Sequence, residues 1–337
     1  MRVAAATSLE DPSAIAVANR PDPTPGPGEA VVRVDAASLN HRDLWKLEDG
    51  RLTHEDLPFV PGGDLAGTVA KTGDGVSNVA EGDRVVLCPL LTCGECRPCR
   101  DGPENMCENY DSYDGAFAER ALVDASRLVA LPDSVSVVDA AALPIAYVTA
   151  YRMLQRGDVS AGDRVFVPGA TGGVGIAAVQ LADLIGAETV GTSSSAEKLE
   201  RVEQEGLDHA IHTADPDAMR TAVAELGAVD ATINHLGGPY THVGAEVLRT
   251  DGAMVICGRT AGQFPEFDAR DLYFGHKRIL GSTLGTQSDL EQLIEFVADG
   301  RLEPVVGEQY PLAETAAAVR DMEARDLVGK LVIRPQE

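Results

Sequence analysis

The chain has 337 residues and carries 28 Lys and Arg against 53 Asp and Glu, a formal net charge of −25. This length exceeds one ordinary hydrophobic core and suits two domains of typical size. The strong negative charge, with no basic patch to meet phosphates, excludes nucleic acid as a partner.

The acidic residues are scattered along the chain, and only five residues are lysine. Self-repulsion at this charge would destabilise a compact fold at low salt, whereas molar salt shortens the Debye length to ~3 Å and screens it. The composition is therefore typical of a halophilic archaeal protein, and an acidic cytosolic enzyme is the alternative interpretation. The N-terminus has no apolar signal core and no segment approaches a membrane span, so we expect a cytoplasmic protein without membrane contact.

Residues 1–130 are predicted to be rich in β-strands. Apolar alternation over 29–39 and 64–76 predicts two strands, the second followed by a turn, and 81–90 predicts another. Helical periodicity then begins, and 139–156 contains few turn residues, so this segment is predicted to be a helix.

Four cysteines lie in one short stretch with the spacing C-x2-C-x2-C-x7-C, namely Cys93, Cys96, Cys99 and Cys107. Thiolates spaced in this way can converge on one tetrahedral ion, and Zn2+ is the usual occupant of an all-sulfur site. Because four thiolates leave no open position for a substrate, the predicted zinc is structural. Two disulfides, free thiols or an iron–sulfur cluster are the alternatives, the last disfavoured by the long final spacing. Cys88 lies outside this set and is expected to be a small buried residue.

From Asp163 onward, strand-like and helix-like segments alternate, which is typical of a doubly wound parallel sheet. Strands are predicted at 163–170, 188–195, 209–213, 229–238, 252–260 and 278–285, and helices at 172–186 and 196–206. The strand at 278–285 is predicted to be an edge strand that pairs with a second copy, so we expect a homodimer or homotetramer. The tail is predicted to form a helix and a strand over 289–312, a helix over 313–323 and a final strand over 329–335.

The turn after the first of these strands reads Gly169-Ala170-Thr171-Gly172-Gly173-Val174-Gly175, an A-x-G-x-x-G variant of the dinucleotide fingerprint. Gly172 is expected to let the backbone approach a pyrophosphate, and Gly175 to let the helix pack close to the strand. The helix N-terminus supplies amide donors to phosphates. Because the motif follows a strand and opens a helix, we predict a dinucleotide site here rather than a merely tight turn.

The end of the second strand distinguishes the two nicotinamide cofactors. A carboxylate there would accept from the ribose 2′-OH of NAD, but Ser193, Ser194 and Ser195 occupy the region and Lys198 follows. Hydroxyls and an ammonium suit a 2′-phosphate, so we predict NADPH in preference to NADH. The serines could instead cap the helix that begins at Ala196, and Ser195 can do so while the other two bind the phosphate.

These features together resemble the medium-chain dehydrogenase/reductase superfamily over nearly the whole chain. The motifs are "SLNHRDLW" (38–45), "VPGGDLAGTV" (60–69), "EGDRV" (81–85), the cysteine lobe, "GATGGVG" (169–175), "GTSSSAEK" (191–198) and "NHLGG" (234–238). The resemblance implies an α/β fold with a GroES-like β-rich substrate domain over 1–145, its zinc lobe at 88–110, and a Rossmann domain with a doubly wound parallel sheet over 146–285. The segment 286–337 is expected to return to the first domain, and in this family the cofactor lies in the cleft.

Zinc alcohol dehydrogenases of this superfamily carry a second, catalytic zinc, and the chain departs from all three of its ligand positions. Asn40 stands at the first, Gly62-Gly63-Asp64 replaces a G-H-E motif at the second, and the third falls in the apolar segment 143–149. His41 and Asp43 could join Asp64 in a variant site. In an extended segment, however, these two would face away from the side of Asn40, and an open zinc site needs about three protein ligands.

The Asn40-x-x-Asp43 segment and the glycine-rich turn are more similar to the zinc-free quinone oxidoreductase branch. Without a Lewis acid nothing polarises an alcohol oxygen, whereas a conjugated acceptor needs only hydrogen-bond donors for its enolate or hydroquinone oxygen. The expected function is NADPH-dependent hydride transfer to a quinone or a conjugated enone or enoyl acceptor, a small-molecule substrate, with one structural Zn2+ per chain. A zinc-dependent alcohol dehydrogenase with variant ligands and a non-catalytic NADPH-binding structural or sensor protein are the alternatives.

Four residues are candidates for the catalytic cleft. Asn40 is expected to be a hydrogen-bond donor, with a buried turn residue as the equal alternative, and Asp43 a structural acceptor rather than a general base. Trp45 and Tyr147 are expected to shape or close the cleft. Arg42 could face the cleft or the solvent.

Further residues are candidates for binding the cofactor. The resemblance places Thr149 against the nicotinamide. His235 ends the fourth strand of the doubly wound sheet, at the carboxyl edge where cofactors lie, and is expected either to pack on the cofactor or to be a passive edge residue. Gly258 and Arg259 follow the next strand and Cys257, and a glycine there would admit the nicotinamide ribose.

Overall fold

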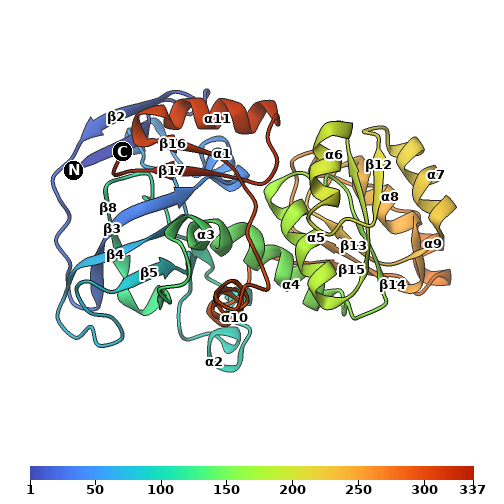
Figure 1. The fold of residues 1–337 in the computed structure, drawn as a ribbon, viewed down its shortest axis with the longest axis horizontal. Helices are drawn as coiled ribbons and strands as arrows, with labels where there is room; N and C mark the ends of the chain where they lie inside the picture. Colours follow the sequence, from blue (N-terminus) through green and yellow to red (C-terminus); the bar gives the residue numbers. More distant parts are fainter. The chain divides into compact units, whose positions relative to one another are not determined.

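The computed structural model of the chain describes all of residues 1–337 (Figure 1). It contains two compact units. The first comprises Met1–Ile145 together with Thr286–Glu337, and the second comprises Ala146–Gly285. The C-terminal tail therefore belongs to the same unit as the N-terminal residues.

The first unit is built on a seven-stranded sheet. Six strands follow the order β16-β17-β3-β4-β5-β9, and β8 also pairs with β3. These strands are β3 (Glu29–Ser38), β4 (Asp64–Thr72), β5 (Arg84–Leu87), β8 (Arg120–Asp124), β9 (Leu128–Ala130), β16 (Val306–Pro311) and β17 (Lys330–Arg334). Only β16 and β17 are parallel. Two smaller antiparallel pairs join β1 (Arg2–Ala6) to β2 (Ile15–Asn19) and β6 (Leu90–Leu91) to β7 (Asp111–Ser112).

Strand β3 is the centre of this sheet, and most of its side chains are buried. The C-terminal strand β17 pairs with it antiparallel, with Val332 opposite Ser38. On the other side of β3, strand β4 places Asp64 opposite Ser38. The end of β3 is therefore the point where the tail and the start of β4 meet, and Figure 1 shows β17 beside β3.

Short helices surround the sheet of the first unit. They are α1 (His41–Glu48), α2 (Arg97–Asp101), α3 (Val137–Ala142), α10 (Gln287–Ala298) and α11 (Thr315–Ala324), with 3-10 turns at His54–Asp56, Glu104–Met106, Ala125–Arg127 and Leu312–Glu314. Helix α1 begins because Asn40 is extended and its N–H donates to the carboxylate of Asp43 at 2.9 Å. Leu44 and Leu47 bury the opposite end of the helix.

The second unit contains a six-stranded parallel sheet in the order β12-β11-β10-β13-β14-β15. Its strands are β10 (Arg164–Val167), β11 (Glu188–Ser193), β12 (His209–His212), β13 (Val229–Asn234), β14 (Leu248–Ile256) and β15 (Arg278–Gly281). Its helices are α4 (Val148–Arg156), α5 (Gly173–Ile185), α6 (Ala196–Glu203), α7 (Pro216–Leu226), α8 (Pro239–Glu246) and α9 (Ala269–Phe274). The spatial order corresponds to 3-2-1-4-5-6, the order of a doubly wound dinucleotide-binding sheet.

The strands predicted for both units are confirmed, and β15 lies at the edge of its sheet as predicted. Helices α7, α8 and α9 were not predicted from the sequence. The expectation that no segment approaches a membrane span is wrong by length and composition, because Val137–Arg156 forms a 20-residue run of helix with mean hydropathy 1.3. The most apolar 18-residue stretch of this helix is 72% buried, as in the core helix of a soluble protein. A π-helical turn at Leu143–Tyr147 separates α3 from α4.

Candidate functional site

The four cysteines predicted to bind zinc converge in the structure. Their Sγ atoms all lie within 4.8 Å of one another, with 3.4 Å between Cys96 and Cys99 and 3.6 Å between Cys107 and Cys93. Zinc–sulfur bonds in a tetrahedron place sulfurs about 3.8 Å apart, so the cluster has the size of a zinc site built from four thiolates. None of the four forms a disulfide.

Backbone amides prepare these sulfurs to bind a cation. The N–H groups of Cys93 and Asn109 both donate to Sγ of Cys107 at 3.3 Å. Backbone hydrogen bonds from Glu95 and Cys96 lower the pKa of Cys93 to about 6. N–H donors favour the thiolate over the thiol, and the thiolate is the form that binds zinc.

Glu104 anchors the lobe to the tail of the chain. Its carboxylate accepts two hydrogen bonds from Arg127 at 3.1 Å and one from the N–H of Gln287, the first residue of α10, at 3.0 Å. Arg127 also donates to Sγ of Cys88, which is buried as expected. An ion held by the four cysteines would therefore support helix α10 rather than contact a substrate.

The glycine-rich turn of the second unit has the geometry of a phosphate-binding loop. Gly172 is the N-cap of α5, and a Cβ there would meet no atom closer than 3.9 Å, so this position is open. A Cβ on Gly175 would lie 2.3 Å from the carbonyl oxygen of Gly169, so only glycine permits this close approach of helix and turn. The first amides of α5, which include Gly173 and Val174, have no partner within the helix and can bind phosphate. Ala170 is fully buried and donates its N–H to Thr192, so it shapes the turn from within.

The serine segment beside this turn divides its tasks. Ser195 caps α6 by accepting from the N–H of Lys198 at 3.3 Å. Ser193 accepts from the N–H of Ser195 at 3.2 Å and lies 3.5 Å from the hydroxyl of Thr171 in the glycine-rich turn. Ser194 is exposed and its carbonyl contacts Nε2 of His212 at 3.0 Å. The exposed end of β11 thus presents hydroxyls with Lys198 and His212 nearby, and no carboxylate. His212 was not identified from the sequence, because neither segment alone predicts the register in which β12 pairs with β11.

The other expected cofactor residues lie in the second unit. Nε2 of His235 is 3.9 Å from the Cβ position of Gly172, so this ring borders the phosphate-binding turn. A Cβ on Gly258 would lie 1.9 Å from the carbonyl oxygen of His235, so the glycine is required by the approach of two strand ends, whether or not a ribose is present. Arg259 follows it. Burial raises the pKa of Cys257 to about 12, so this thiol is not a nucleophile. Thr149 is 6% exposed on α4.

Tyr147 does not have the position of a cleft residue. It is 0% exposed, and its hydroxyl donates to Oε1 of Gln180 on α5 at 2.7 Å. Trp45, by contrast, is half-buried on α1, with its ring 6.3 Å from that of His41.

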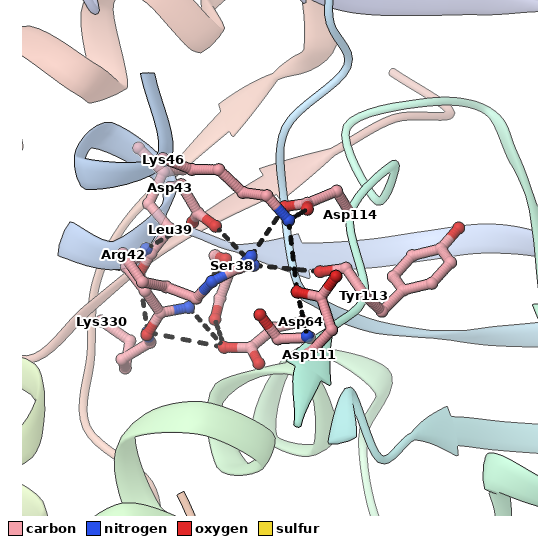
Figure 2. Close-up of polar contacts among 12 residues, drawn as sticks. Ser38, Leu39, Arg42, Asp43, Lys46, Asp64, Asp111, Tyr113, Asp114 and Lys330 are labelled. Carbon is pink, nitrogen blue, oxygen red and sulfur yellow. Dashed lines mark hydrogen bonds and ion pairs between the residues drawn. The ribbon is translucent and has the colours of Figure 1, made fainter. Parts of the chain in front are cut away.

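Asn40 lies in a buried network of hydrogen bonds and charges, and Figure 2 labels its partners Ser38, Asp64 and Lys330. Its amide Nδ2 donates to Oδ2 of Asp64 at 2.8 Å, and its Oδ1 accepts from Nζ of Lys330 at 2.6 Å. Ser38 also donates to Oδ2 of Asp64, at 2.7 Å, and Lys330 donates to the carbonyl oxygen of Leu39 at 2.6 Å. Asn40 is 8% exposed, so its amide is a structural group and not a free donor to a substrate.

A second cluster adjoins this network through Asp43. Arg42 donates from Nη1 to Oδ1 of Asp43 at 3.1 Å and to the carbonyl oxygen of Tyr113 at 3.0 Å. Its Nη2 donates to Asp114 at 2.8 Å, and Lys46 forms an ion pair with the same carboxylate. Asp43 is therefore an acceptor that holds both the start of α1 and the guanidinium of Arg42.

Burial dominates the electrostatics of both clusters. It raises the pKa of Asp43 to about 7, since the field of Arg42 offsets only part of the desolvation. It also raises the pKa of Asp64 and lowers that of Lys330, each opposed by the other's charge. The pKa of Arg42 is raised, because Asp43 and Asp114 outweigh its own desolvation. The guanidinium is the group that stays charged at any physiological pH.

These positions do not fit a catalytic zinc. Gly63 stands where the usual histidine ligand would be, and Nη1 of Arg42 lies 2.6 Å from the place that a Cβ there would occupy, so a side chain at this position would have to displace the guanidinium. Asn40 instead accepts a hydrogen bond from Lys330, and Asp64 accepts one from Ser38. Across the whole chain, the four cysteines are the only group of three or more His, Cys, Asp or Glu side chains placed to share one ion. The variant site from His41, Asp43 and Asp64 is therefore not formed. The expected extended backbone at His41 and Asp43 is also wrong, because α1 begins at His41.

The zinc lobe gives a testable prediction. Replacing the most buried ligand, Cys107→Ser, should reduce bound zinc from one per chain to below about one tenth, because three ligands hold structural zinc far less tightly than four. It should also lower the melting temperature, since the anchor at Glu104 loses its support. Cys257→Ser is the matched control and should retain one zinc. Equal zinc in the two variants, measured by mass spectrometry of metals, would contradict the assignment.

His41 gives a pH-dependent prediction. Burial, with the nearby charges of Arg325 and Lys330, lowers its pKa from 6.5 to about 4. The unfolded chain therefore binds this proton more readily than the folded chain between pH 6.5 and 4. His41 does not lower the free energy of unfolding above pH 6.5, and it lowers it progressively as the pH falls below 6.5. The shift corresponds to about 3 kcal/mol.

In the cofactor-free protein, His41→Gln should remove the part of the pH dependence of stability that comes from this imidazole. Its free energy of unfolding should fall less steeply than that of the wild type between pH 6.5 and 4.5. Parallel curves from chemical denaturation, or an imidazole that titrates near 6.5 by NMR, would refute the prediction.

Comparisons with known proteins agree with this geometry. Residues 26–133 match the family described as alcohol dehydrogenase GroES-like domain, and residues 173–299 match the zinc-binding dehydrogenase family. An alcohol dehydrogenase from Rhizobium meliloti (strain 1021) is 32% identical over 310 residues, which cover 90% of each protein. A crotonyl-CoA reductase from Streptomyces collinus is 32% identical over 364 residues, which cover 94% of this chain and 81% of that protein.

Solved structures give the same result. An NAD-dependent alcohol dehydrogenase superposes with a TM-score of 0.92 at 34% identity over 99% of both chains. A 2-octenoyl-CoA carboxylase reductase in complex with NADP and 2-octenoyl-CoA superposes with a TM-score of 0.89 at 27% identity, over 99% of this chain and 87% of that one. With its GroES-like domain, its Rossmann domain and these relatives, the chain belongs to the medium-chain dehydrogenase/reductase superfamily of oxidoreductases.

Proposed function

We propose that the protein transfers hydride from NADPH to a conjugated acceptor, either the C=C bond of an enone or enoyl thioester or a quinone, without a catalytic zinc. The observation that carries this proposal is the position of Arg42. Its guanidinium lies against Gly63, where zinc alcohol dehydrogenases need a histidine, and Asp64 is committed to Ser38, Asn40 and Lys330. A site of this kind has a guanidinium at the position of the histidine ligand but no open metal position.

The reaction class follows from this arrangement. Oxidising a simple alcohol requires a group that lowers the pKa of its hydroxyl, which a metal does well. A conjugated carbonyl is already activated at its β-carbon, and hydrogen-bond donors suffice to hold the oxygen that becomes negative. The matched relatives include crotonyl-CoA and acryloyl-CoA reductases as well as alcohol dehydrogenases, which supports an enoyl acceptor for this chain.

The cofactor proposal depends on the second unit. Bound reduced nicotinamide supplies the hydride. The chain's own part is to hold the pyrophosphate at the N-terminus of α5 and the 2′-phosphate near Ser194, Lys198 and His212. A carboxylate, which would repel that phosphate, is absent from the end of β11.

We also propose a cytoplasmic homo-oligomer that is active at molar salt. The edge strand β15 is free to pair with a second copy, and large aromatic side chains precede it at the surface. Phe264, Tyr273 and Phe274 are 88%, 62% and 65% exposed. The net charge of −25 favours folding where salt screens it.

The proposed function is tested by an acceptor panel at molar KCl. NADPH oxidation should be rapid with enoyl thioesters, enones or quinones, and primary and secondary alcohols should reduce NADP+ at least about 100-fold more slowly, because no metal activates the hydroxyl. Zinc should be measured in the same sample. Two zinc ions per chain with alcohol oxidation would establish the variant alcohol dehydrogenase instead. NADPH binding without any turnover would establish a non-catalytic protein.

The cofactor preference is tested at the exposed Ser194. Ser194→Asp places a carboxylate beside the 2′-phosphate, so kcat/KM with NADPH should fall at least about tenfold relative to that with NADH, from repulsion in a partly screened site. Ser126→Asp adds the same charge at an exposed position of the first unit and should leave the ratio unchanged. An unaltered ratio in Ser194→Asp would place the phosphate elsewhere.

A further inference from the structure

We propose that Arg42 takes over the electrostatic role that a catalytic zinc has in related alcohol dehydrogenases: its guanidinium binds the carbonyl oxygen of the conjugated acceptor and stabilises the enolate that hydride addition forms. This inference rests on the proposed function and names the group that holds the substrate oxygen.

The hydrogen bonds of Arg42 leave donors for a ligand. A guanidinium has five N–H groups. Three of them have acceptors within the chain, in Asp43, the carbonyl of Tyr113, and Asp114. The remaining two, on Nε and Nη2, have none. The side chain is 17% exposed, so it is held in the fold without being sealed from solvent.

Lys330 and Asn40 cannot serve in its place. Nζ of Lys330 is directed to Leu39, Asn40 and Asp64, and the residue is only 2% exposed. The amide of Asn40 donates to Asp64 and, at 3.4 Å, to the carbonyl of Ser38. Lys46 is as exposed as Arg42, at 17%, but its ammonium is paired with Asp114 and Asp111. Arg42 is therefore the cation beside Gly63 that has both uncommitted donors and access.

The guanidinium is also preorganised. Asp43, which is 2% exposed, fixes it from one side, and Asp114 fixes it from another. Lys46 forms ion pairs with both Asp114 and Asp111, so it offsets part of the negative charge around Arg42 (Figure 2). A donor held in place before the reaction stabilises a developing oxyanion without reorganising, which is the main source of such catalysis.

The acceptor is reduced by hydride addition followed by protonation. The β-carbon of the acceptor gains a C–H bond with the hydride electron pair supplied by NADPH, while the C=C π pair shifts toward the carbonyl and the C=O π pair moves onto oxygen. The N–H groups of Arg42 hold this enolate oxygen. A proton from water then adds to the α-carbon, so the C=C bond is reduced by two electrons and the nicotinamide is oxidised by two.

The test compares Arg42→Gln, Arg42→Lys and Arg42→Gly with Arg33→Gln, an exposed arginine of the same unit, using the best acceptor of the panel. Loss of an oxyanion donor costs about 10²–10³ in kcat, so Arg42→Gln should show this loss with a dissociation constant for NADPH within about twofold of the wild type. Arg42→Lys keeps the charge but loses the planar arrangement of donors, so its kcat should lie between those of the wild type and Arg42→Gln. Guanidinium ion at millimolar concentration should restore part of kcat in Arg42→Gly, and Arg33→Gln should match the wild type.

The outcomes separate the two proposals. A wild type that reduces no conjugated acceptor overturns the proposed function and this inference with it. An active wild type with folded Arg42→Gln or Arg42→Lys at full kcat overturns only this inference. The same holds if kcat falls in Arg42→Gly and guanidinium restores none of it while circular dichroism and NADPH binding are normal, because a structural arginine then explains the loss.

Discussion

The buried ammonium of Lys330 fixes the C-terminal strand of the chain to the rest of the first unit. The residue is 2% exposed, and its ammonium donates to Leu39 and Asn40, with Asp64 3.7 Å away. Removing one member of a buried ion pair destabilises a protein by about 3–5 kcal/mol, because the other charge is left buried without compensation. Lys330 is 290 residues away from Asn40 in sequence, so this requirement ties the last strand to the start of α1 and to β4. The tail is thus held by charge as well as by the pairing of β17 with β3.

The same requirement accounts for the absence of a fitting zinc position. A carboxylate that neutralises a buried lysine cannot also be given up to a metal without leaving that lysine uncompensated. Asp64 keeps one oxygen, Oδ1, without a partner, yet Gly63 contributes no side chain and Arg42 fills the adjoining space with positive charge. A divalent cation there would face the guanidinium of Arg42, and the carboxylate of Asp64 is already paired with Lys330. The network and a catalytic metal are therefore alternative ways to place positive charge at one position of the fold.

The sequence predicted what depends on local spacing. The cysteine lobe and the glycine-rich turn each lie within about one short segment, so the residues that meet in space are close in the chain. The prediction was weaker where strand register decides. Ser38, Lys330 and Asp114 were not identified, because their contacts arise from the pairing of β17 and β4 with β3 and from the loop after β7.

Asn40 illustrates a different limit. Its amide could have faced a substrate or the interior, and only the position of Lys330 decides in favour of the interior. The helix that begins at His41 did have a sequence signal, since Asn40 followed by Asp43 at the third helical position is a capping pattern, but reading the segment as extended overlooked it.

The distribution of lysine shows how an acidic chain keeps such a network. Of the five lysines, Lys46, Lys277 and Lys330 have side chains only 17%, 5% and 3% exposed, and each is paired with aspartate. Salt screens charges at the surface far more than charges in the interior. The repulsion among exposed carboxylates therefore depends on salt, while the pairs that fix Arg42 and Lys330 do not. Salt should act on this protein mainly by permitting it to fold, and the chemistry of the folded site should vary little with ionic strength.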